Sequence, residues 1–238
     1  MPMLRILRLL ERAYGKRPWR QWGDPVSVLV ETILSQNTSD ANSSAGYRQL
    51  RRRFRSWPAV AAAPVGEIEK CIRVSGLSRI KAPRIQGILR RIRQDRGKIS
   101  LDFLRRMTPA DATNYLCSFK GIGPKTAACT LLFSLQMPVF PVDTHILRIA
   151  KRLGLVPARA TAEDVQETLT PRIPPARRYS MHVLLIEHGR RTCRARSPRC
   201  PWCPLLPICP HGRKRAQAEE RVPSRRPAAF PPKPSRRD

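Results

Sequence analysis

Long apolar runs are missing from this 238-residue chain. No stretch approaches the roughly 18 apolar residues that a membrane-spanning helix needs, so the sequence predicts no such span. The arginine-rich N-terminal segment has no small-residue cleavage site, which argues against a secretory signal, although its composition leaves organellar targeting open. We therefore expect a reducing interior, which means a cytoplasmic, nucleoid-associated protein if the source is prokaryotic.

Acidic and aromatic residues are also scarce. The chain has 17 Asp and Glu against 46 Lys and Arg, for a formal net charge of +29. An excess this large indicates a polyanionic partner, most simply nucleic acid. Because aromatic residues make up only 6% of the chain, we expect Leu, Ile, Val and Ala to supply most of the core.

Strand signals are few, and apolar residues recur at helical spacing along most of the chain. The predicted helices are an amphipathic N-terminal segment and residues 25–37, 67–75, 83–94, 101–107, 109–119, 144–152, 161–169 and 178–188, with the apolar run after Pro124. The fold class is therefore all-α. Residues 211–238 are basic, proline-rich and poor in apolar side chains, which predicts a disordered basic tail. The tail serves either as an arm on phosphates or simply as a solvated terminus.

Four cysteines follow one another closely near the C-terminus, with gaps of six, two and five residues: Cys193, Cys200, Cys203 and Cys209. Thiolates gathered in this way in a reducing compartment are more typical of a metal centre than of disulfides. Structural zinc sites usually have two short loops between ligands, and this run has one. Since Cys₄ is also the usual ligand set of a [4Fe–4S] cluster, the spacing favours a cluster and leaves zinc open.

A second motif lies in LCSFKGIGPKT, residues 116–126, where Gly121 and Gly123 flank one apolar residue between two predicted helices. Glycines let a backbone approach a phosphate closely, and Pro124 suits the first position of a helix. The free N–H groups of the turn and of the next helix can then face an anion. The pattern therefore predicts a helix–hairpin–helix element that binds DNA.

Two charged residues, one in this element and one after it, are candidates for a role in catalysis. Lys125 stands at the N-terminal end of a helix, where the dipole disfavours a cation, and a deprotonated amine there is a nucleophile. A lysine that contacts phosphate is the alternative. Asp143, in PVDTHILRIAKRLGL, precedes a basic helix. It is either an N-cap or a carboxylate facing a reaction centre that develops positive charge.

The hairpin segment, the PVDTHILRIAKRLGL segment and the cysteine run together resemble the endonuclease III family of DNA glycosylases over roughly residues 25–210. The cysteine spacing matches that family's cluster motif without a gap. The resemblance implies a [4Fe–4S] cluster and a two-lobed, all-α fold. Residues 22–133 would form a six-helix barrel with the helix–hairpin–helix at about 109–135. Residues 1–21 and 134–210 would form a discontinuous cluster domain.

The resemblance also implies an activity on double-stranded DNA containing damaged bases or abasic sites. A nucleotide is flipped out of the stack, and Lys125 attacks C1′ of its sugar while Asp143 stabilises the developing positive charge. The resulting Schiff base allows β-elimination, so the protein would be a glycosylase and an abasic-site lyase, acting as a monomer on oxidised pyrimidines.

The expected DNA contacts come from four regions. Residues 33–40 lie where the family fills the gap left by the flipped base, and Asn37 stands where the family commonly has Gln, with Gln36 beside it. Helix-end capping is the alternative role of Asn37. Lys81, in the turn GLSRIKAP, is an expected phosphate contact, as are the glycines of the hairpin. The loop from Cys193 to Cys200 would direct the guanidinium groups of Arg194, Arg196 and Arg199 at phosphates.

Two alternatives remain. One is a monofunctional glycosylase for mismatched or alkylated bases, in which Lys125 only contacts phosphate. The other is a cluster-bearing DNA-binding module without chemistry, for which the two glycines and the basic surface would suffice. The pairing of Lys125 with Asp143 argues against the second alternative, because a DNA-binding module needs no carboxylate facing the DNA.

Overall fold

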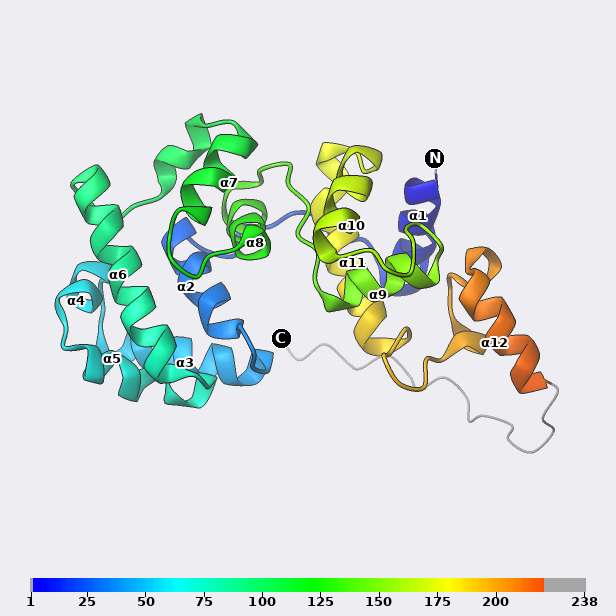
Figure 1. Ribbon diagram of the computed structural model, residues 1–238, viewed down its shortest axis with the longest axis horizontal. Helices are drawn as coiled ribbons and strands as arrows, with labels where there is room; N and C mark the ends of the chain where they lie inside the picture. The colour runs from blue at the N-terminus through cyan, green and yellow to red at the C-terminus, as the bar shows by residue number, and fades with distance from the viewer. Residues whose placement is uncertain (1, 221–238) are drawn as a thin grey trace. The chain divides into compact units, whose positions relative to one another are not determined.

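The structure, a computed structural model, describes residues 2–220, and all regular structure in them is helical (Figure 1). The α-helices are α1 (Pro2–Tyr14), α2 (Pro25–Ser35), α3 (Asp40–Arg53), α4 (Trp57–Ala62), α5 (Val65–Ile72), α6 (Ser78–Arg96), α7 (Pro109–Cys117), α8 (Pro124–Leu135), α9 (Thr144–Arg152), α10 (Ala162–Leu169), α11 (Arg178–Arg191) and α12 (Pro210–Glu220). Short 3₁₀ helices include η1 (Arg73–Ser75) and η2 (Asp102–Arg106). The predicted all-α class is confirmed, and no helix in the described range combines the length and apolar character of a membrane span.

Local sequence signals fix where many of these helices begin. An N-cap side chain accepts a backbone N–H bond at the start of α2, α3, α4, α7, α9 and α10: Asp24, Ser39, Ser56, Thr108, Asp143 and Thr161. Proline occupies the first turn of α2, α4, α7 and α8, where its missing N–H costs nothing. Each of the six N-cap side chains stabilises its helix by about 1 kcal/mol.

The chain forms two compact units, and the second is inserted into the first. Of the described residues, unit 1 contains 2–17, 142–173 and 180–220. Unit 2 contains Pro18–Pro141 and Pro174–Tyr179. The sequence places the boundaries at 21/22 and 133/134. In the structure the second boundary lies after Pro141, later than expected. Met137 and Val139 therefore belong to unit 2, where they pack on the core formed by α2 to α8.

Unit 2 is built around α2 and α8, which pack against each other. Every residue of α8 from Thr126 to Leu135 is buried, and α2 buries most of its apolar side chains. Trp22 stacks on Phe133 with ring centroids 4.2 Å apart, and its backbone N–H donates to the Phe133 carbonyl. A helix that is buried on all sides is rigid, so α8 is a firm base for the residues at its N-terminus.

Helices α3, α4 and α12 are absent from the sequence-based prediction. The buried face of α3 consists of Ser43, Gly46 and Leu50, and a Cβ on Gly46 would lie 3.2 Å from that of Ser75. Small residues at a close helix contact give almost no hydrophobic pattern. The sequence therefore does not indicate α3. Helix α12 corrects the predicted tail, because residues 210–220 are helical and pack against α9. The rest of that tail lies outside the described residues.

Unit 1 gathers helices from both ends of the chain. Met3 and Ile6 of α1 meet Ile146 and Ile149 of α9, with Leu185 of α11 lining the same apolar pocket. Because α1 contributes buried side chains, the amphipathic first helix predicted from the sequence is part of a core.

Candidate active site and candidate metal centre

The helix–hairpin–helix consists of α7, a turn over residues 118–123, and α8. The turn closes with a hydrogen bond from the Ile122 N–H to the Phe119 carbonyl, and Gly121 has φ of +83°, which favours glycine. Gly123 is the N-cap of α8, and no side chain caps this helix. Since N–H groups in a first helical turn have no intrahelical acceptor, this end of α8 suits an anion. The predicted hairpin is thus present, and the side chain of Lys125 is exposed in its first turn.

A polar network lies directly behind the hairpin. A Cβ on Gly121 would lie 2.3 Å from Cζ of Arg84, so this glycine also makes room for a guanidinium group from α6. Arg84 Nη1 donates to Gln36 Oε1 at 3.1 Å, and Gln36 Nε2 donates to Thr126 Oγ1 at 3.2 Å. Gln36 is therefore engaged within unit 2 and connects the end of α2 to the residue after Lys125.

Asn37 lies next to this network and is exposed, with φ of +54°. Asparagine tolerates this left-handed conformation better than most residues, and it follows the C-cap of α2, where such a residue commonly ends a helix. Its position fits the helix-end role, and its exposure leaves the side chain available for DNA.

Lys81 is the predicted phosphate contact that the structure corrects. Its side chain is only 1% exposed, and Nζ donates to the carbonyls of Leu34, at 2.7 Å, and Ser75, at 2.8 Å. These carbonyls lie at the C-terminal ends of α2 and η1, where a helix dipole favours a cation. Burial, and then the charge of Arg84, lower the pKa of Lys81 below its usual value. Lys81 therefore ties α2 to the turn before α6.

Replacing Lys81 with Met is expected to destabilise unit 2. The change leaves two buried carbonyls without a donor, and one unsatisfied buried acceptor costs about 1–3 kcal/mol. We expect a loss of about 2 kcal/mol or more in the free energy of unfolding, measured by urea denaturation. Lys70→Met is the control, since the Lys70 side chain is 68% exposed and pairs with Glu67 at the surface. Equal midpoints for the two variants would show that Lys81 has no structural role.

Leu77 and the first turn of α6 present apolar side chains to solvent. Leu77 is 49% exposed and Ile80 is 53% exposed. Leu77 also has φ of +52°, which is unusual for leucine, in the residue that precedes α6. An exposed leucine in a strained conformation is a functional candidate, since such strain persists where surrounding structure holds it.

Asp143 begins α9 in unit 1. Its Oδ1 accepts the backbone N–H of Ile146 at 2.8 Å, so the predicted N-cap is present. The side chain is half-buried, and no hydrogen bond to Oδ2 is found among residues 2–220. One carboxylate oxygen is thus fixed by the helix while the other can meet a substrate.

Helix α9 also holds the start of the cysteine run. Arg148 donates from Nε and Nη2 to the carbonyl of Cys193, at 3.0 and 2.8 Å. One turn later, Arg152 donates to the Arg194 and Ala195 carbonyls and, from Nη1, to Cys193 Sγ at 3.2 Å. Two arginines from the helix that Asp143 caps therefore fix this loop.

All four cysteines line a single pocket of unit 1: Cys193, Cys200, Cys203 and Cys209. Within residues 2–220 there is no group of three or more His, Cys, Asp or Glu side chains arranged to hold a metal ion. The donor chemistry nevertheless fits an iron–sulfur cluster, because four soft sulfur donors meet around one space. Two of the sulfurs accept N–H bonds: Gly212 N–H donates to Cys209 Sγ at 3.3 Å, and Arg152 Nη1 donates to Cys193 Sγ.

Burial raises the pKa of the Cys203 thiol to about 12, with further contributions from its neighbouring cysteines. Burial also raises the pKa of Cys209. Thiolates at these positions therefore need a compensating positive charge, which a bound metal centre supplies.

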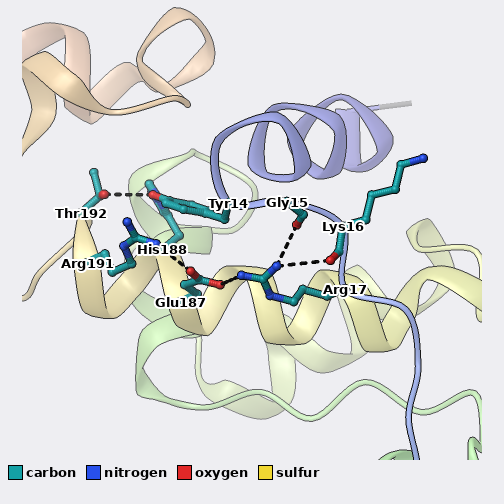
Figure 2. Close-up of polar contacts among 8 residues, drawn as sticks. All are labelled: Tyr14, Gly15, Lys16, Arg17, Glu187, His188, Arg191 and Thr192. Atoms are coloured by element: carbon teal, nitrogen blue, oxygen red, sulfur yellow. Dashed lines mark hydrogen bonds and ion pairs between the residues drawn. The ribbon is translucent and has the colours of Figure 1, made fainter. Parts of the chain in front are cut away.

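A second polar network joins α1 to this pocket (Figure 2). The Tyr14 hydroxyl lies 2.8 Å from His188 Nδ1 and 2.9 Å from Thr192 Oγ1. On the other side of the His188 imidazole ring, Nε2 lies 3.7 Å from Cys203 Sγ. Burial, and then the charge of Arg148, lower the pKa of His188 to about 4, so its imidazole is neutral at pH 7.

Glu187 reinforces the junction of α1 with α11. Its Oε2 accepts from Arg17 Nη2 at 2.7 Å and its Oε1 accepts from Arg191 Nη1 at 2.8 Å (Figure 2). The guanidinium of Arg191 also lies over the ring of Tyr14, 5.1 Å from its centroid. The hydroxyl and the ring of Tyr14 are thus both in contact with α11.

The three arginines predicted to contact phosphate lie in the cysteine loop. Arg194 and Arg196 are exposed, and Arg199 is half-buried. The backbone N–H of Arg199 donates to the carbonyl of Thr192, which closes the loop. Two of the three guanidinium groups are therefore available at the surface of unit 1.

Several residues of these sites escape the sequence analysis. Arg148 and Arg152 have a detectable signal, since two arginines one helical turn apart share one face of a basic helix. Tyr14 and His188 have none, because 174 residues separate them. A groove beside the hairpin adds three cationic side chains whose place could not be predicted: Arg84, Arg91 and Lys120.

Comparisons with known proteins agree with this architecture. Residues 30–175 match the model of the HhH-GPD superfamily base excision DNA repair protein. An Arabidopsis thaliana protein named "Putative DNA glycosylase" is 40% identical over 162 residues, which are 68% of this chain and 55% of that protein. The chain thus spans about half the length of this relative. Endonuclease III of Thermotoga maritima is 33% identical over 198 residues, or 83% of this chain and 88% of that enzyme.

A solved structure extends the likeness to three dimensions. The structure titled "Structure of a Trapped Endonuclease III-DNA Covalent Intermediate: Estranged-Adenine Complex" has a TM-score of 0.77 and 30% identity, covering 90% of this chain and 98% of that one. With the hairpin, the Asp143 segment and the cysteine pocket in place, the chain belongs to the HhH-GPD superfamily of base excision DNA repair proteins and, within it, to the endonuclease III family.

Proposed function

We propose that this protein is a bifunctional DNA glycosylase and abasic-site lyase that removes oxidised pyrimidines from double-stranded DNA. The observation that carries the proposal is the exposed amine of Lys125 at the uncapped N-terminus of α8. Support comes from the similar solved structure, whose title describes a covalent intermediate with DNA. Such an intermediate needs a nucleophile on the protein, and Lys125 is the side chain suited to that role here.

The hairpin would bind a phosphate next to the damaged nucleotide, while the base is flipped out of the stack. The Lys125 amine then forms a bond to C1′ as the N-glycosidic bond breaks, and the base leaves with the electron pair and takes up a proton. The sugar ring opens to a Schiff base. Loss of a proton from C2′ breaks the bond between C3′ and its phosphate oxygen, which cuts the strand.

Asp143 would act at the same sugar. Cleavage of the glycosidic bond gives C1′ and the ring oxygen oxocarbenium character, which a carboxylate stabilises. The carboxylate would also accept a proton from Lys125 and so help the amine to attack. Because Oδ1 caps α9, the carboxylate is already oriented before DNA arrives.

The four cysteines would hold a [4Fe–4S] cluster, which supplies a rigid centre for the loop rather than chemistry at the sugar. With that loop fixed, Arg194, Arg196 and Arg199 can be directed at phosphates. Iron and sulfide analysis of the purified protein tests this assignment. About four of each per chain supports a cluster, whereas zinc without sulfide would refute it.

Leu77 is proposed to enter the base stack where the damaged nucleotide leaves, since apolar side chains commonly act as wedges in DNA. Leu77→Ala is expected to weaken binding to a duplex with one abasic site about tenfold, or about 1.4 kcal/mol. Fluorescence anisotropy gives the dissociation constants. Val65→Ala is the control, since Val65 is a 40% exposed side chain on α5. The same affinity in both variants would exclude Leu77 from the interface.

The proposed activity is tested with a duplex that carries one oxidised thymine. The bifunctional enzyme cleaves the strand directly, and borohydride traps the protein on the DNA. A monofunctional glycosylase would leave an abasic product that breaks only with alkali. A module without chemistry would bind the duplex and leave the base in place.

A further inference from the structure

We propose that Tyr14 and His188 form a hydrogen-bond relay that ends on the thiolate of Cys203 and sets the reduction potential of the cluster. The inference rests on the cluster proposed above, and it concerns two residues outside the cysteine loop. The relay is visible as a continuous set of contacts from Thr192 Oγ1 to the Tyr14 hydroxyl, to His188 Nδ1, and from His188 Nε2 to Cys203 Sγ.

The direction of the relay follows from the sulfur atom. A cysteine thiolate that binds metal can only accept hydrogen bonds, so His188 Nε2 must carry the proton that points at Cys203. In a neutral imidazole, Nδ1 is then an acceptor, and the Tyr14 hydroxyl donates to it. The Tyr14 oxygen in turn accepts from the Thr192 hydroxyl. Each of the four groups therefore has a defined donor or acceptor role.

Burial gives these bonds their strength. His188 and Thr192 are each only 1% exposed, and Tyr14 is 9% exposed. Hydrogen bonds in such surroundings are electrostatically stronger than in water, and successive bonds polarise one another. Donation by Tyr14 makes the opposite N–H of His188 a better donor, so a change at Tyr14 is transmitted to Cys203.

The expected consequence concerns electron transfer. A hydrogen bond to a ligand sulfur stabilises the more negative form of the cluster, so it raises the reduction potential. The relay would therefore make the cluster harder to oxidise by one electron. Tyr14 belongs to α1, so this helix takes part in protecting the cluster.

The test is voltammetry of the purified holoprotein, with the electrode as the electron acceptor. His188→Leu is expected to lower the midpoint potential by about 59 mV, which is a tenfold change in a one-electron equilibrium. Tyr14→Phe keeps the ring and removes only the hydroxyl, and we expect a smaller shift in the same direction. Tyr179→Phe is the control, since its buried hydroxyl accepts from Trp22 Nε1 in unit 2.

Iron analysis of the wild type precedes the voltammetry, so absence of a cluster is recognised as failure of the cluster assignment itself. A negative shift in Tyr14→Phe, at an unchanged melting temperature and iron content, supports the relay. An unchanged potential in Tyr14→Phe overturns it, even if His188→Leu loses its cluster or fails to fold. An equal shift in Tyr179→Phe would also overturn it, because the effect would then not come through His188.

Discussion

Lys125→Ala is expected to abolish strand cleavage and borohydride trapping while binding to damaged DNA survives. The proposed Schiff base needs a primary amine, which Lys125 supplies in the first turn of α8. Binding should persist because the backbone N–H groups of the hairpin, the groove arginines and the cysteine loop remain. Gel analysis of a duplex with one abasic site, with and without borohydride, measures both steps, and anisotropy measures the affinity.

Lys120→Ala is the matched control for this experiment. Lys120 is an exposed lysine in the turn of the same hairpin, so its loss removes one positive charge at nearly the same place. We expect it to weaken binding, and to reduce the salt dependence of binding by about one phosphate contact, without loss of trapping. Trapping by Lys125→Ala at the wild-type level would move the nucleophile elsewhere and end the proposed mechanism.

Asp143→Asn is expected to lower the rate of base excision by about 10²–10⁴-fold, the usual contribution of a positioned acid or base. The amide has no charge with which to stabilise an oxocarbenium ion, and it cannot take a proton from Lys125. The fold should survive, because asparagine caps helices as well as aspartate does and can still accept the Ile146 N–H. Single-turnover kinetics on an oxidised thymine duplex give the rate.

Asp24→Asn is the control for Asp143→Asn, because it makes the same chemical change at another N-cap, that of α2. We expect wild-type excision from it. If Asp143→Asn excised the base as fast as Asp24→Asn, Asp143 would be a helix cap only, and a binding module would become the better interpretation of the chain.

The sequence predicts the fold well where local chemistry decides it. Helices α7 and α9 match their predicted starts because Thr108 and Asp143 are strong caps. It fails where tertiary packing decides, as in α3, whose buried face depends on Gly46 meeting Ser75.

The residues of the candidate site also differ in how far the sequence predicts them. Gly121 could be identified from sequence because its chemistry is local, and the grouping of the four cysteines followed from their spacing. The burial of Lys81 could not be predicted, since its hydrogen-bond acceptors are backbone carbonyls at the ends of two other helices. The partners of Tyr14 are equally invisible, because only the folded chain brings them together.

The insertion of unit 2 into unit 1 has a consequence for synthesis on the ribosome. Residues 18–141 emerge as one continuous stretch, so unit 2 can begin to fold while the rest of the chain is still being made. Helix α1 is made before α11 but must wait for it, because Tyr14 bonds to His188 and Thr192. Its apolar face therefore stays exposed until α11 has been made, and the cysteine pocket is completed after the helix–hairpin–helix.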